Sequence, residues 1–98
     1  MARVVVTDQA KRDIRRILSD LTERAGHRVV ERYAAEFKAA YRRLNSFPDS
    51  GAPRPALGLG TRIVLVLPYI VIYESREDTV TVLRVMHGKR NITRDIIR

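Results

Sequence analysis

The sequence contains no cysteine, no tryptophan and no long apolar run, and these absences already exclude several classes of protein. Without cysteine the chain forms no disulfide and offers no thiolate ligand or nucleophile, which suits a reducing compartment. No apolar run reaches the roughly 18 residues typical of a membrane-spanning helix. The three valines at residues 4–6 are also fewer than the apolar region of a signal peptide requires. We therefore expect a cytoplasmic protein that makes no membrane contact.

Acidic residues are scarce relative to basic ones, and this imbalance indicates the kind of partner. The chain has 19 lysines and arginines against 11 aspartates and glutamates, for a formal charge of +8, and 16 of the 19 are arginine. Arginine carries a planar fork of donors that suits carboxylate or phosphate groups. The composition therefore predicts a partner rich in acidic groups, either a nucleic acid or an acidic protein segment.

The first half of the chain predicts a short strand and two helices. The β-branched residues 4–6 predict a strand that ends at Thr7, a suitable N-cap for a helix. Apolar residues then form a stripe along one face of that helix: Ala10, Ile14, Ile17, Leu18, Leu21 and Ala25. After Gly26, a second stripe predicts another helix, which Pro48 ends: Val30, Tyr33, Phe37, Ala40, Tyr41, Leu44 and Phe47. A one-residue break between two amphipathic helices predicts an antiparallel hairpin.

The second half predicts a loop and three strands. Residues 48–60, PDSGAPRPALGLG, hold three prolines and three glycines without a periodic pattern, so they form either a functional loop or a tethered surface connection. Strands are predicted at residues 61–67, 69–75 and 79–87, and their short connections make them antiparallel. The order β-α-α-β-β-β predicts an α+β fold as a single domain, residues 1–98. In this fold the N-terminal helical hairpin packs on one face of a small, mainly antiparallel sheet.

The residues that commonly hold metals or cofactors are poorly represented. Only His27 and His87 offer imidazole, and neither belongs to a ligand pair. The glycines at 58 and 60 and at 88 complete neither a phosphate-binding loop nor a dinucleotide pattern. The serines also lack the context of a hydrolase nucleophile. We expect no metal and no cofactor.

His87 stands at the end of the last predicted strand, directly before Gly88. One interpretation is structural, with the imidazole hydrogen-bonded to a backbone carbonyl so that it holds the turn that Gly88 opens. The other is functional, because imidazole is able to exchange a proton near neutral pH or to contact a phosphate. The sequence leaves both open.

The basic residues fall into two groups. On the predicted helices, acids lie four positions from bases, as in Arg16/Asp20, Asp20/Arg24 and Arg32/Glu36, which predicts a solvated, self-paired face. The sheet region differs, because few acids lie near its bases in the sequence: Arg54, Arg62, Arg84, Lys89, Arg90, Arg94 and Arg98. If the strands bring Arg62, Arg84 and Arg90 together, their combined field attracts an anion.

Several short patterns occur in a fixed order along nearly the whole chain. They begin with Thr-x-x-Ala-x-x-Asp-Ile from Thr7, Pro-x-x-Gly from Pro48 and Gly-Thr-Arg at residues 60–62. They continue with Tyr-x-x-x-Tyr from Tyr69 and Leu-Arg-Val-Met-His-Gly-x-Arg at residues 83–90. Together they resemble the ParE/RelE superfamily of toxins from bacterial toxin–antitoxin systems.

Two activities occur within that superfamily, and particular residues separate them. The RelE-like branch consists of ribosome-dependent messenger-RNA endonucleases, but this sequence has Ile70 in place of their strand arginine and Gly88 in place of their tyrosine. The His-Gly-x-Arg ending resembles the ParE branch instead, which implies a non-enzymatic inhibitor of DNA gyrase. We expect the target-binding residues to be Arg62, Arg84, His87, Lys89, Arg90 and Arg94. The alternatives are a RelE-like ribonuclease that uses Arg62, His87 and Arg90, and a stand-alone nucleic-acid-binding module.

The resemblance also implies a protein partner, a ParD-like antitoxin. The C-terminal segment of such an antitoxin wraps around the toxin, while its N-terminal part binds operator DNA, so this chain is expected to contact DNA only indirectly. An acidic, amphipathic segment fits an arginine-rich surface. We expect it to contact Ile17, Leu21, Tyr33, Phe37 and Arg62. The last residues, 91–98, are expected to contribute to toxicity without carrying core packing.

Overall fold

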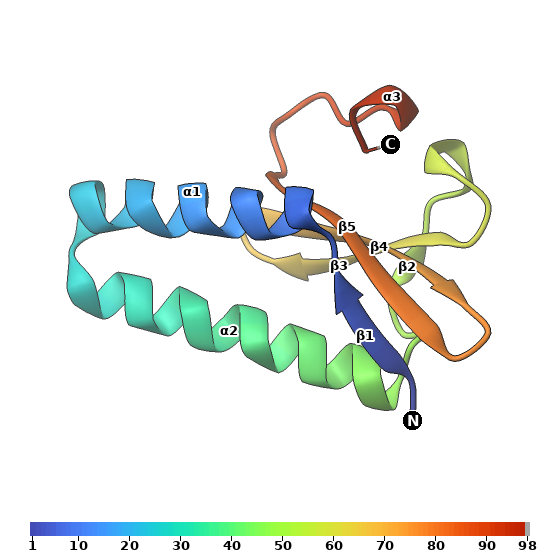
Figure 1. Ribbon diagram of the computed structural model, residues 1–98. Helices are drawn as coiled ribbons and strands as arrows, with labels where there is room; N and C mark the ends of the chain where they lie inside the picture. The colour runs from blue at the N-terminus through green and yellow to red at the C-terminus, as the bar shows by residue number, and fades with distance from the viewer. Residues whose placement is uncertain (98) are drawn as a thin grey trace.

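The computed structural model describes residues 1–97 and confirms the predicted α+β fold (Figure 1). The elements follow in the order β1 (Arg3–Val6), α1 (Asp8–Ala25), α2 (His27–Ser46), β2 (Ala52–Pro53), η1 (Pro55–Leu57), β3 (Thr61–Val66), β4 (Tyr69–Arg76), β5 (Thr79–His87) and α3 (Arg94–Ile97). Three short elements, β2, η1 and α3, lie where the sequence predicted no regular structure. No helix within residues 1–97 is long and apolar enough to span a membrane.

The helical hairpin forms for the local reasons that the sequence indicated. Thr7 caps α1, since its hydroxyl oxygen accepts a hydrogen bond from the Ala10 amide at 3.1 Å and donates to the Leu83 carbonyl at 3.2 Å. Gly26, with φ of 86°, is the only residue between the two helices, and this positive φ favours glycine. The end of the hairpin where α1 meets α2 extends beyond the sheet (Figure 1).

The five strands form one mixed sheet in the order β1-β5-β4-β3-β2. β1 runs parallel to β5 at one edge, and all other neighbours are antiparallel. The turn between β3 and β4 contains the cis peptide bond of Leu67 and Pro68, and the next turn has positive φ at Glu77 and Asp78. The prediction of a small, mainly antiparallel sheet is therefore confirmed.

The hairpin covers one face of this sheet and forms the main core with it. Phe37, Ala40 and Leu44 of α2 and Ala10 of α1 are at most 4% exposed. They pack with side chains from the central strands: Val64, Val66, Val71, Tyr73, Val80, Val82 and Val85. Most of the apolar stripe on each helix therefore faces the sheet, as the periodicity predicted, but Phe47 lies beyond the end of α2 and is 65% exposed, so its place in the second stripe was wrong.

The opposite face of the sheet is covered in part by the end of the chain. Ile97 is only 5% exposed and packs in a second cluster with Ile63, Ile72 and Met86. Ile92 and Ile96 lie at the border of this cluster. The expectation that the last residues carry no core packing is wrong, because a sheet with two apolar faces needs a cover on both sides.

The loop between α2 and β3 is tethered to the sheet near its start. The buried Tyr73 hydroxyl donates to the Pro48 carbonyl at 2.8 Å and accepts from the Gly51 amide at 2.9 Å. A Cβ at Gly51 would lie 2.5 Å from the Tyr73 oxygen and 2.6 Å from the Ile63 carbonyl oxygen. The Pro-x-x-Gly pattern therefore marks a close approach of the loop to the sheet, which favours the tethered interpretation for this part of the loop.

Replacing Gly51 with alanine tests that close approach. Gly51→Ala is expected to lower the free energy of unfolding by about 2–3 kcal/mol, because the new methyl group displaces either Tyr73 or the β3 backbone. Urea unfolding followed by circular dichroism measures the change, with the exposed neighbour Ser50→Ala as control. A Gly51→Ala stability equal to that of the control would contradict the packing described here.

Candidate functional site

A cavity of about 200 Å³ lies between α1 and the adjoining ends of β4 and β5. Its charged and aromatic lining comes from α1, from both strands and from the loop after β5: Asp13, Arg16, Asp20, Arg24, Tyr69, His87 and Arg90. The structure thus brings His87 and Arg90 together. It also adds two arginines of α1 that the sequence analysis had placed on a self-paired surface.

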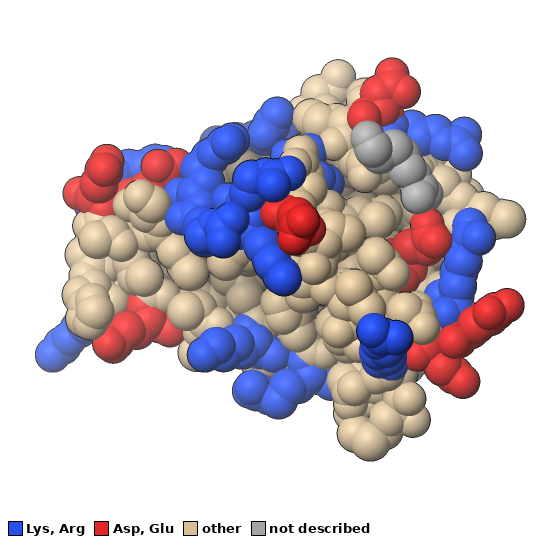
Figure 2. Space-filling model, in the orientation of Figure 1, with Lys and Arg blue, Asp and Glu red and all other residues tan. Residues whose placement is uncertain are grey.

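Arg16 and Arg24 were missed because the sequence suggested that Asp20 pairs with both. None of the ion pairs within residues 1–97 includes Asp20 or either arginine. Lys and Arg side chains gather over α1 in the space-filling view (Figure 2). The spacing of Asp13, Arg16, Asp20 and Arg24 along one helix face was the available signal, since residues three or four apart share a face.

His87 ends β5, and its ring has a structural role. Its Nδ1 accepts a hydrogen bond from the Lys89 amide at 3.1 Å. A neutral imidazole that accepts at Nδ1 carries its proton on Nε2. The imidazole does contact the turn that Gly88 opens, but the expected carbonyl partner is wrong, because the ring accepts from the Lys89 amide. Glycine suits position 88 because the backbone there lies close to the turn between β3 and β4. The Gly88 amide donates to the Pro68 carbonyl at 2.8 Å, and a Cβ at this position would lie 3.2 Å from that oxygen.

Tyr69 links His87 to the helical hairpin. Its ring lies edge-to-face against both His87 and Tyr33, with centroid separations of 5.8 and 5.6 Å. A third ring, Phe37, lies 5.9 Å from it. Burial raises the pKa of the Tyr69 hydroxyl above its usual value, and the protonated hydroxyl is able to donate a hydrogen bond at the cavity.

Arg62 does not belong to this site. Arg62 of β3 pairs with Tyr73 of β4, whereas His87 of β5 pairs with Tyr69 of β4. Tyr69 and Tyr73 are four residues apart along the strand, which corresponds to about 13 Å. The Arg62 Nη1 donates to the carbonyls of Asp49 and Gly51 at 2.9 and 2.8 Å, so the guanidinium holds the loop after α2. The structure therefore does not assemble the ribonuclease set of Arg62, His87 and Arg90.

Arg84 was expected on the target-binding surface, but it lies in the interior and is 8% exposed. Its Nε and Nη2 donate to the Asp13 carboxylate at 2.7 and 3.0 Å, and its Nη1 donates to the Ile96 carbonyl at 2.6 Å. The hydrogen bond to Asp13 raises the pKa of Arg84 against the opposing effect of burial. Arg84 is thus removed from the exposed cations by a partner 71 residues away in the chain.

Asp13 also completes the edge of the sheet. Its Oδ2 accepts from the Val85 amide at 3.0 Å, at a point of β5 beyond the last residue that β1 pairs with, Val82. The carboxylate thus takes the place that a strand carbonyl would fill. One side chain fastens α1 to β5 and, through Arg84, to α3.

The remaining residues predicted to bind the antitoxin or the target differ in how exposed they are. Phe37, expected to bind the antitoxin, is 3% exposed and belongs to the core, so it offers no surface. Ile17, Leu21 and Tyr33 are partly exposed. On the predicted target side, the exposed Lys89 follows the strand end, and the exposed Arg94 begins α3. In the described part of the chain, residues 1–97, no three acidic or histidine side chains converge on a metal position.

Three comparisons relate the chain to known proteins. Residues 4–92 match the family model described as ParE toxin of type II toxin-antitoxin system, parDE. Toxin ParE3 of Caulobacter vibrioides is 30% identical over 92 residues, which make up 94% of this chain and 92% of that protein. A solved structure of the chromosomal ParDE TA system from P. aeruginosa has a similar fold, with a TM-score of 0.73. It shares 18% identity over 89% of this chain and 96% of that one.

Proposed function

The chain belongs to the ParE family of toxins from type II toxin–antitoxin systems, and on that premise we propose that it inhibits DNA gyrase and is neutralised by a ParD-like antitoxin. The observation that carries this proposal is the family match across residues 4–92, nearly the whole length. DNA gyrase acts on chromosomal DNA, so the toxin would work in the cytoplasm. Contact with operator DNA would come only through the antitoxin.

The toxin would act by binding rather than by cleaving RNA. Cleavage by the 2′-hydroxyl requires groups that activate the nucleophile, protonate the leaving oxygen and stabilise the phosphate in the transition state. Arg62 holds the loop carbonyls instead of facing His87, and the His87 Nδ1 already accepts from Lys89. These positions favour a binding surface over a ribonuclease centre.

The surface around His87 is the best candidate for contact with the target. Arg16, Arg24 and Arg90 line one cavity with His87, and Lys89 is exposed beside them. Their guanidinium groups suit carboxylates on a protein or the phosphates of the DNA that gyrase holds. Arg84 and Arg62 would contribute indirectly, by holding the scaffold together.

A gyrase assay tests the proposal. The purified chain is expected to inhibit DNA supercoiling and to trap the cleaved gyrase–DNA complex at near-stoichiometric concentration. Arg90→Glu is expected to raise the concentration for half inhibition by about tenfold or more, equivalent to a loss of roughly 1.4 kcal/mol of binding free energy. Arg28→Glu, an exposed site at the start of α2, is the matched control and should leave inhibition unchanged.

Two outcomes would count against the proposal. If DNA supercoiling by gyrase is unchanged at a large excess of the chain, the proposed inhibition is refuted. Messenger-RNA cleavage in a translation reaction that disappears in His87→Ala would instead establish the ribonuclease alternative.

A further inference from the structure

A hollow of about 310 Å³ opens between α1, α2 and the end of β1. The two helices meet at Gly26 and spread apart toward β1, and the hollow lies in this wider part (Figure 1). Three elements line it: Val6 of β1, Lys11, Ile14 and Arg15 of α1, and Tyr41 of α2. The hollow is separate from the His87 cavity, since the two share no lining residue.

The floor of the hollow is apolar. Val6, Ile14 and Tyr41 pack against the main core and are partly exposed. The Tyr41 hydroxyl oxygen is buried, so the exposed part of this side chain belongs to its ring. An aromatic ring at the surface is the usual platform on which an unpaired nucleic-acid base stacks.

Basic side chains stand on both helices at the rim of the hollow. Lys11 and Arg15, one turn apart on α1, belong to its lining. Lys38 and Arg42, one turn apart on α2, are exposed and flank Tyr41 in the sequence. Lys and Arg side chains gather over α1 and over the facing part of α2, with uncharged surface between them (Figure 2). We call these four residues the rim cations.

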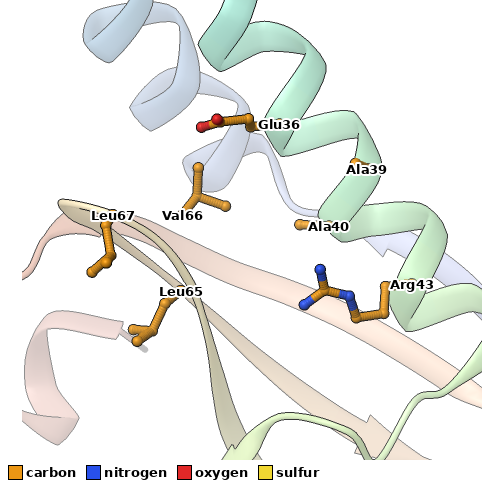
Figure 3. Close-up of a pocket in the computed structure, with 7 residues that line it drawn as sticks. All are labelled: Glu36, Ala39, Ala40, Arg43, Leu65, Val66 and Leu67. Carbon is orange, nitrogen blue, oxygen red and sulfur yellow. The ribbon is translucent and has the colours of Figure 1, made fainter.

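The position of Lys38 on α2 is set by the contact of this helix with the start of the chain. Asn45 shares a helix face with Lys38, seven residues before it, and donates from its side-chain amide to the Ala2 carbonyl beside β1. On the other side of α2, Arg43 points into a groove of about 400 Å³ beside residues 65–67 (Figure 3). There β3 has no neighbouring strand on its outer edge within residues 1–97, because β2 pairs only with two residues near its start. Arg43 is therefore not one of the rim cations.

The charge of the rim cations is not balanced inside the molecule. Within residues 1–97 their side chains take part in no ion pair and no hydrogen bond. Of the acids close to them in sequence, Asp13 pairs with Arg84, and Glu36 lines the groove on the other side of α2. Asp8, in the first turn of α1, offsets only part of the charge. Like charges gathered in this way attract an anion.

The arrangement of these charges fits a phosphate backbone. Residues four apart on a helix are separated by about 6 Å along its axis, and each helix presents two cations at that spacing. A nucleic-acid strand repeats one negative charge with every nucleotide. Proteins that bind single strands combine a positively charged groove with an aromatic side chain for a base, and both are present here. A second copy of this chain fits poorly, since it would bring another +8 of net charge.

We propose that the face between α1 and α2 binds single-stranded nucleic acid without sequence preference. The strand lies along the groove between the helices, its phosphates contact the rim cations, and one base packs on Ile14 and the Tyr41 ring. Every base has a flat face that is able to stack, so no sequence is favoured. This site is independent of the proposed function, because neither gyrase nor an antitoxin takes part in it. It also does not concern operator DNA, which is a duplex.

The salt dependence of binding tests the phosphate contacts. Fluorescence anisotropy with a labelled oligothymidine strand and the full chain measures the affinity at several salt concentrations. With four phosphate contacts, the logarithm of the affinity should fall with the logarithm of the salt concentration at a slope of about −3. Raising the salt from 50 to 200 mM should therefore weaken binding roughly 50-fold.

Charge reversal on α1 tests whether the rim cations carry this binding. Lys11→Glu combined with Arg15→Glu should weaken binding at least about tenfold at 50 mM salt and reduce the slope to about −1.5. Arg28→Glu combined with Arg54→Glu is the matched control, since both sites are exposed, lie away from the hollow and change the net charge equally. The control should stay within about twofold of the unmodified chain, because distant charges are screened.

Methyl NMR tests the floor of the hollow without any substitution. Oligothymidine should shift the methyl signals of Val6 and Ile14 and leave those of Val5 unchanged, because Val5 lies on the opposite face of β1. A strand of equal length without bases should bind at least about fivefold more weakly, because it cannot stack on Tyr41.

Several outcomes would overturn the inference. They are an absence of binding at 50 mM salt, unchanged Val6 and Ile14 signals, and a control variant weakened as much as the rim variant. Tighter binding of a duplex than of the single strand would show that no unpaired base is held. Equal binding of polyglutamate with the same charge would assign the rim cations to an acidic protein instead. None of these results bears on gyrase inhibition, which is measured separately.

Discussion

Deleting residues 91–98 is expected to lower the free energy of unfolding by about 4 kcal/mol, at roughly 1.5–3 kcal/mol for each well-buried isoleucine side chain that is lost. Ile97 is 5% exposed against Ile63, Ile72 and Met86, and Ile92 and Ile96 pack at the border of that cluster. The deletion also removes the Ile96 carbonyl that accepts from Arg84. Urea unfolding measures the change.

Asp95→Ala is the control, because this side chain belongs to the same short helix but is exposed. It should stay within about 0.5 kcal/mol of the unmodified chain, as is usual for surface substitutions. A truncated chain as stable as this control would contradict the packing of α3 on the sheet. If the truncated chain is destabilised as expected, a loss of toxicity on truncation would reflect the loss of the fold. Target contacts are therefore better tested with point variants such as Arg90→Glu.

Replacing Asp13 with alanine is expected to cost about 3–5 kcal/mol of stability, the range for removing one partner of a buried ion pair. Arg84 would keep a buried positive charge without its carboxylate, and the Val85 amide would lose its acceptor. Both Asp13 and Arg84 are 8% exposed, so water does not readily replace the lost partner. The free energy of unfolding in urea is again the measurement.

A double-mutant cycle separates the ion pair from general packing. Asp13→Ala combined with Arg84→Met should be clearly less destabilised than the sum of the two single variants, since the double variant leaves no unpaired charge. Asp20→Ala, an exposed acid on the same helix, should have little effect. Additive costs for Asp13 and Arg84 would show that their contact contributes nothing beyond packing.

Local patterns predicted most of the secondary structure. The strand at residues 79–87 has the predicted bounds, and the helix that begins at Asp8 follows the Thr7 cap. These features depend on neighbours within a few residues, such as a capping hydroxyl or a period of two or 3.6. The short strand β2 was missed, because its two residues pair with Arg62 and Ile63 of β3 and carry no periodic pattern of their own.

The candidate site was less predictable. The sequence identified His87 and Arg90, but it grouped them with Arg62 and Arg84 because all four lie near few acids along the chain. The register of the sheet separates Arg62 from His87, and Asp13 buries Arg84. Scarcity of acids nearby in the sequence carries no information on how strands pair in register or on which distant side chain, such as Asp13, contacts a given arginine.

The sequence by itself determined the α+β class, the helical hairpin around Gly26, four of the five strands and the resemblance to the ParE/RelE toxins. Each of these follows from local periodicity, special backbone residues or the order of short patterns. Only the tertiary structure decided which arginines are exposed rather than held in internal contacts. It also decided which segment covers the second face of the sheet, and where the edge of β3 has no neighbouring strand. These properties depend on contacts between residues far apart in the chain, as with Asp13 and Arg84, and no local pattern specifies them.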